Sequence, residues 1–107
     1  MFLPNKIRVE ILLPLFDNEG NAIDKSKFFE TRKELVTEFK ACTFLGPTQG
    51  MWIDNEEKEY NDIHCGFYVM APNTEKSTNF FKNYKETLKK RFKQLDVLIT
   101  YYPVEIL

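Results

Sequence analysis

The chain has 107 residues, of which 43% are hydrophobic, 15% aromatic and 29% charged, with a formal net charge of −1. This length allows one domain with one core, and the charge balance argues against a constitutive nucleic-acid binder. No apolar run approaches the roughly 20 residues that a membrane-spanning helix needs, and the N-terminus shows no secretory signal. We therefore expect a single domain over residues 1–107, located in the cytoplasm and without membrane contact.

The chain opens with a predicted strand and helix. Residues 7–16 place apolar side chains at every second position, which is the period of a strand. Pro14 cannot donate a ladder hydrogen bond, so regular pairing should weaken near the end of this strand. Asp24 is a suitable N-cap for a helix that continues to about Ala41, with apolar residues at helical spacing.

The middle of the chain predicts a loop followed by a hairpin. Residues 46–50 contain two glycines and a proline and are predicted as a loop. A short strand opens at residues 51–53, residues 54–59 form a charged turn, and residues 60–71 alternate as a long strand. Alternation places Ile63 with the core-facing residues of that strand.

The last third predicts a helix and a closing strand. Residues 75–95 have apolar side chains at steps of three and four, and residues 96–107 are rich in β-branched and aromatic residues. The resulting βαββαβ order predicts an α+β, ferredoxin-like sandwich. Its four-stranded antiparallel sheet would have two helices on one face, with residues 7–16 and 60–71 as its central strands.

Several short segments support a resemblance that spans nearly the whole chain. They are Leu13-Pro14-Leu15, Phe29-x-Thr31-x-x-x-Leu35-x-x-x-Phe39, Trp52 after Gly50, and Pro103-Val104-Glu105-Ile106-Leu107. In these segments the chain resembles small bacterial proteins of the ferredoxin-like type that have no assigned activity. The resemblance implies the fold and carries no chemistry.

The face of the predicted sheet away from the helices is unusually apolar. Leu12, Tyr68, Met70 and Tyr102 are predicted to lie on it, together with Trp52 if that side chain faces outward. A sheet face that meets water is normally polar, and large exposed apolar patches mark contact sites. We therefore predict a homodimer joined through this face, with a different protein as the alternative partner.

Chemistry, if the chain performs any, is predicted to involve His64 and Tyr68 on that face. A histidine in apolar surroundings can act as a neutral base near pH 7. Alternation points Cys65 to the opposite face from His64, so these two cannot form a nucleophile–base pair. Cys42 follows a helix C-terminus, where the helix dipole raises the pKa of a thiol. Both cysteines are interpreted as structural.

The remaining patterns are weaker. Asp17 ends the first strand, where some nucleases of this fold carry a catalytic aspartate. Gly66-Phe67 matches only part of an RNA-recognition motif, which needs exposed aromatics two residues apart. No group of ligands stands at metal spacing, and no cofactor motif is present, so neither metal nor cofactor is expected.

Three functional hypotheses follow. The first is a non-catalytic binding or assembly module that forms a homodimer. The second is a cofactor-free enzyme of the dimeric α+β-barrel type, in which His64 and Tyr68 would line a cavity with Tyr102 and act on a small organic substrate. The third is an RNA-binding or nuclease-like domain.

Overall fold

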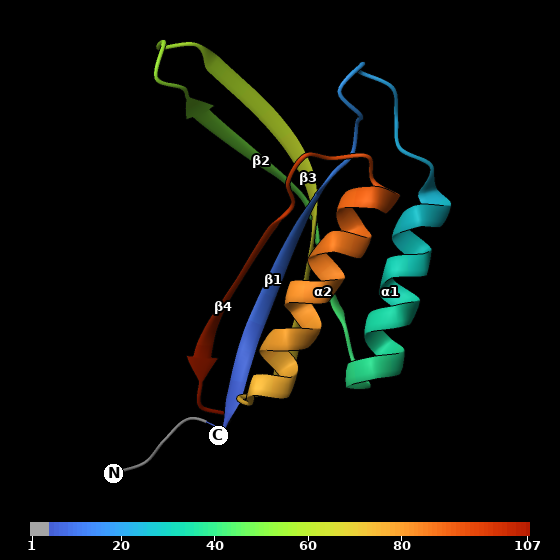
Figure 1. The fold of residues 1–107 in the computed structure, drawn as a ribbon, viewed down its shortest axis with the longest axis vertical. Coiled ribbons are helices and arrows are strands. Elements are labelled where there is room, and N and C mark those ends of the chain that lie inside the picture. The colour runs from blue at the N-terminus through green and yellow to red at the C-terminus, as the bar shows by residue number, and fades with distance from the viewer. Residues whose placement is uncertain (1–4) are drawn as a thin grey trace.

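The computed structural model describes residues 5–107, which form strands and helices in the predicted order (Figure 1). The elements are β1 (Lys6–Pro14), α1 (Lys25–Phe39), β2 (Thr43–Ile53), β3 (Glu59–Pro72), α2 (Glu75–Arg91) and β4 (Leu98–Val104). The βαββαβ prediction is confirmed.

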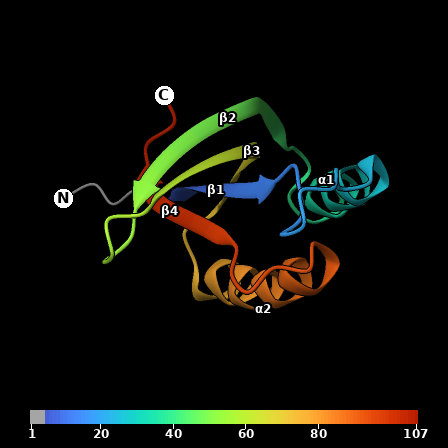
Figure 2. The same cartoon turned by 90° about the horizontal axis from the view of Figure 1, so that it is seen from above.

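The strands form one sheet in the order β2-β3-β1-β4, and every neighbouring pair is antiparallel. β1 and β3 occupy the centre, as their alternation predicted. Both helices lie on the same side of the sheet (Figure 1 and Figure 2). The arrangement is therefore the predicted ferredoxin-like sandwich.

The core fills the space between the sheet and the helices. The four alternating side chains Ile7, Val9, Ile11 and Leu13 of β1 have no exposed surface. The residues that pack against them come from β3 and both helices, and include Phe67, Val69, Leu35, Leu88 and Phe92. Burying one such side chain contributes about 1.5–3 kcal/mol, so these central strands fix the fold.

Both helices begin where the sequence predicted. The Asp24 carboxylate accepts a hydrogen bond from the Ser26 backbone N–H at 2.8 Å, and Thr74 caps α2 in the same way. The prediction that α2 reaches residue 95 is wrong. Lys93 has a left-handed φ of 53°, which ends the helical path and leaves Leu95 in a loop.

The largest departure from the prediction is β2. Residues 46–50 were predicted as a loop but form the middle of this strand. β2 is an edge strand, so Pro47 needs no donor on its outer side. Gly46 lies at a bulge in the β2–β3 register and has a φ of 80°, a conformation that glycine adopts without strain. The glycines and the proline of residues 46–50 therefore belong to an irregular edge strand and not to a loop.

β2 and β3 are longer than β1, and their excess length projects as a two-stranded arm (residues 49–63). β1 ends at Pro14, which pairs with His64, whereas the β2–β3 ladder continues to the Ile53–Glu59 pair. Figure 1 shows the arm extending past both helices. Ile63 was predicted to face the core but is 45% exposed, because no helix covers this part of the sheet.

A polar bridge joins the two helices. Arg91 of α2 contacts the Glu34 carboxylate at 2.6 Å and donates to the Thr31 hydroxyl at 2.9 Å. The Tyr84 hydroxyl donates to the same Glu34 carboxylate at 3.0 Å. The Arg91 side chain is only 11% exposed, so this bridge holds α1 against α2 from within the helical layer.

Candidate functional site

The face of the sheet opposite the helices, called here the open face, carries a mixed set of side chains. Register places on it Arg8, Glu10 and Leu12 of β1, Thr48 and Trp52 of β2, Tyr60, Asp62, His64, Tyr68 and Met70 of β3, and Leu98, Thr100 and Tyr102 of β4. No helix covers this face (Figure 2). Trp52 lies on the open face, the placement on which its predicted role depended.

The open face is hollowed at the end where β1 stops and the arm begins. This open-face cavity has a volume of about 810 Å³. The arm forms one side, the segment after β1 a second, and the connection from α2 to β4 a third. It is lined by Leu12, Pro14, Phe16, Asp17, Asn18, Trp52, Tyr60, Asn61, Asp62, Ile63, His64, Gln94, Asp96, Val97 and Leu98. A cavity of this size can hold a small organic molecule.

Two stacked rings form the arm side of the cavity. The indole of Trp52 lies on the ring of Tyr60 with their centroids 4.2 Å apart and their planes at 11°. Trp52 Nε1 donates to the Asp62 carboxylate at 2.8 Å, and the Tyr60 hydroxyl donates to Asp54 at 3.2 Å. These bonds fix both rings, so the cavity has a preorganised aromatic wall.

The charges that line the cavity are all negative. Asp17, Asp62 and Asp96 contribute carboxylates, and the lining contains neither lysine nor arginine. Hydrogen bonds from the backbone of Asn21 and Glu19 hold the pKa of Asp17 below its usual value and outweigh the opposing effect of desolvation. Asp96 is paired with Lys85 at 2.9 Å. The cavity therefore favours neutral or cationic molecules over anions.

His64 lines the open-face cavity from β3. In register it lies between Pro14 of β1 and Thr48 of β2, and it is partly buried. The Thr48 hydroxyl is buried and has no hydrogen-bond partner within residues 5–107. This part of the open face therefore has unused hydrogen-bonding capacity.

The structure divides the predicted site residues into two groups. Leu12, Asp17, Trp52 and His64 line the cavity. Tyr68, Met70 and Tyr102 lie nearer the other end of the sheet, in register with Glu10 or Arg8. The expected grouping of His64 with Tyr68 and Tyr102 around one cavity is therefore not found, because His64 lies opposite the end of β1 and Tyr68 lies opposite Glu10.

Tyr68 is engaged by neighbours on its own face. The Arg8 guanidinium lies 3.7 Å from the centre of the Tyr68 ring and pairs with Glu10 at 2.9 Å. This cation–π contact holds the ring against the sheet. Tyr68 thus belongs to a polar cluster at the centre of the open face.

Sequence reasoning missed Tyr60, Asp62, Gln94 and Asp96. Tyr60 and Asp62 alternate with His64 on one strand, so the period of two already placed all three on one face. Gln94 and Asp96 reach the cavity only through tertiary structure, because they follow α2 and no local pattern marks them.

The two cysteines are free thiols in separate surroundings. Burial raises the pKa of Cys65 to about 11, and burial likewise raises the pKa of Cys42 despite the opposing charge of Arg32. A thiol in this state is a poor nucleophile. Across residues 5–107 there is no group of three or more His, Cys, Asp or Glu side chains that could hold a metal ion. No helix in that range is long and apolar enough to cross a membrane.

Comparison with known proteins supports the fold. No protein-family model matches the chain, and no curated protein sequence does. Among solved structures, the chain is similar to a phage SAM lyase in complex with S-methyl-5'-thioadenosine, with a TM-score of 0.69 at 9% sequence identity. The match covers 96% of this chain and 84% of the lyase chain. At this identity the likeness shows the fold alone.

Proposed function

We propose that the protein is a small binding module that forms a homodimer through its open face. The observation that carries this proposal is the apolar surface left exposed there. The residues Trp52, Leu98 and Tyr102 are 49%, 57% and 47% exposed, because the helices cover only the opposite face of the sheet. Apolar side chains gathered on an uncovered sheet face are typical of contact sites.

A two-fold contact suits this surface. In an isologous dimer each side chain meets the partner's copy of the same patch, so exposed rings and leucines on one sheet would pack against those of the other. Two sheets packed face to face lie about 10 Å apart. Such a contact would also cover the mouth of the open-face cavity and remove its contents from water.

Sedimentation velocity over a concentration series tests the dimer. Leu98→Glu should weaken association by about 30-fold or more, because it places a charge in the apolar part of the proposed contact. Leu95→Glu is the matched control, since Leu95 is 92% exposed and lies in the α2–β4 connection, outside the open-face register. A protein that stays monomeric at tens of micromolar would refute the proposal, as would equal effects of the two variants.

A second candidate is action on a small organic substrate, without a cofactor, inside the open-face cavity. The specific support is the presence of His64 in a cavity with a fixed aromatic wall. The phage lyase of similar fold binds S-methyl-5'-thioadenosine, which makes this nucleoside a reasonable first probe. A flat purine could stack on Trp52, where base stacking contributes about 1–3 kcal/mol.

Trp52 is the sole tryptophan of the chain, so its emission reports directly on this cavity. Saturable quenching by S-methyl-5'-thioadenosine, lost in Asp62→Ala because the indole N–H then has no carboxylate to hold it, would support the second candidate. Unchanged emission up to about 1 mM nucleoside would reject this ligand. Turnover of any later substrate should require His64 and survive replacement of Cys42.

The nucleic-acid alternative receives less support. Phosphates are bound by lysine and arginine, whereas the charged residues lining this cavity are aspartates. For location, we propose the cytoplasm because both cysteines are free thiols, as is usual in a reducing compartment.

A further inference from the structure

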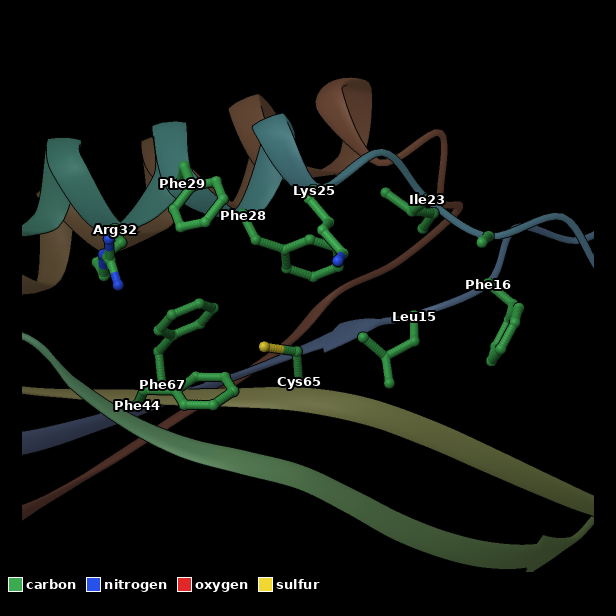
Figure 3. A pocket seen from close by; sticks show the side chains of 11 residues that line it. Leu15, Phe16, Ile23, Lys25, Phe28, Phe29, Arg32, Phe44, Cys65 and Phe67 are labelled. Carbon is green, nitrogen blue, oxygen red and sulfur yellow. The ribbon is translucent and has the colours of Figure 1, made fainter.

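A second cavity lies on the other side of the sheet, between α1 and the strands (Figure 3). This apolar pocket has a volume of about 480 Å³. Figure 3 shows Phe28 entering it from α1, with Phe44, Phe67 and Cys65 facing it from β2 and β3. Leu15 closes one end.

The pocket exists because the aromatic side chains around it pack sideways instead of across the gap. Phe28 packs on Phe92 of α2 with ring centroids 5.1 Å apart, and Phe44 packs on Phe67 at 5.6 Å. The space between these two pairs stays open to the surface. Phe29 and Phe44 are 57% and 55% exposed at its rim, which is costly for phenylalanine in water.

The charged residues that line the apolar pocket are both cations. Lys25 and Arg32 both belong to α1, seven residues apart, which separates their backbones by about 10 Å along the helix. Figure 3 shows both side chains directed from the helix toward the strands. Arg32 lies over the Phe29 ring at 5.1 Å, and neither cation forms an ion pair with another residue of 5–107.

We propose that the apolar pocket binds a free medium-chain carboxylic acid. The phenylalanine walls take the unbranched hydrocarbon chain, and Arg32 or Lys25 pairs with the carboxylate at the mouth. Both features are needed, since an apolar cavity alone would accept any hydrophobic molecule, and two surface cations alone would accept any anion. This site is separate from the proposed dimer, because it opens on the helix side of the sheet.

A chain-length series tests the apolar part. Hexanoate, octanoate and decanoate are titrated by calorimetry below their micellar concentrations. Affinity should rise about fourfold for each added methylene until the pocket is full, the effect of transferring one CH₂ out of water. Affinity that does not change with chain length would overturn the proposal.

Comparison of octanoate with octan-1-ol tests the charged part. Wild-type protein should prefer the acid, and Arg32→Gln with Lys25→Gln should bring the two ligands to equal affinity. Lys33→Gln is the matched control, because Lys33 is exposed on the same helix and lies outside the pocket. Equal loss in the control would mean non-specific attraction and would overturn the proposal.

Trp52 emission separates this site from the open face. Octanoate bound in the apolar pocket should leave the emission unchanged, because Trp52 lines the open-face cavity and not the apolar pocket. A change in emission that follows the calorimetric curve would place the ligand in the open-face cavity and refute the inference. Failure of the dimer test would leave this result unaffected.

Discussion

Replacing Arg91 by methionine should destabilise the protein by about 2 kcal/mol. Each charge-assisted hydrogen bond of the bridge is worth about 1.5–3 kcal/mol. The loss of stability should be smaller than the summed contributions of the bonds from Arg91 to Glu34 and to Thr31. The Glu34 side chain is 41% exposed, so water can solvate it once Arg91 is gone. Methionine retains most of the packing of the arginine stem. For a domain of this size the melting temperature should fall by roughly 10 °C.

Thermal and urea denaturation measure this change, and Lys90→Met is the control. Lys90 is an exposed cation of the same helical turn, so its loss should cost less than about 0.5 kcal/mol. A double-mutant cycle with Glu34→Gln isolates the pair, and its coupling should exceed about 1 kcal/mol. Additive effects, or equal effects of Arg91→Met and Lys90→Met, would refute the bridge as a stabilising contact.

The same bridge should respond to acid. Burial alone would raise the pKa of Glu34, but hydrogen bonds from Arg91 and Tyr84 and the charge of Arg91 outweigh it and hold the pKa below its usual value. Stability from a lowered carboxylate pKa is present above the unfolded value and is lost as pH falls through the folded value. The difference between wild type and Arg91→Met should therefore shrink in acid. A constant difference down to about pH 3 would contradict this reasoning.

Three further outcomes are expected. Gly46→Ala should destabilise the protein by more than about 1 kcal/mol in urea denaturation, because Gly46 has a left-handed backbone. Gly50→Ala in the same strand is the control and should be neutral, because Gly50 has a φ outside that region and an added Cβ would meet no atom within 4 Å. Burial raises the pKa of Tyr84, so wild type should lose stability above about pH 10, where the unfolded chain ionises, and Tyr84→Phe should lose less in a pH series. Tyr60→Leu should shift Trp52 emission to longer wavelength, because the indole loses its stacked neighbour; an unchanged spectrum would refute that contact.

The sequence predicted the elements whose signals are local. Alternation identified both central strands, and Asp24 located the start of α1. β2 was mostly missed, because glycine and proline in residues 46–50 have the composition of a loop, while an edge strand with a bulge tolerates both. No local sequence signal distinguishes a loop from a bulged edge strand here, because only the pairing with β3 makes residues 46–50 a strand.

The candidate site was predictable to the same extent. The period of two placed His64 and Tyr68 on one face of the sheet. Which of them would line a cavity depended on where β1 stops, and the sequence pattern does not show that. The apolar pocket was not predicted at all, because Phe44 lay beside the expected loop and no local pattern marked Phe29 as the rim of a cavity. Both features depend on contacts between segments far apart in the chain.

The two cavities meet just beyond the point where β1 stops. Pro14 ends the regular ladder because it cannot donate to it, and beyond it one backbone hydrogen bond, from Leu15 to Ile63 at 3.2 Å, still joins the chain to β3. Phe16 follows this point, is 48% exposed, and lines both the open-face cavity and the apolar pocket. Phe16→Ala would therefore enlarge both sites and could not separate their roles. Leu98 and Arg32 can, because each lines only one of the two.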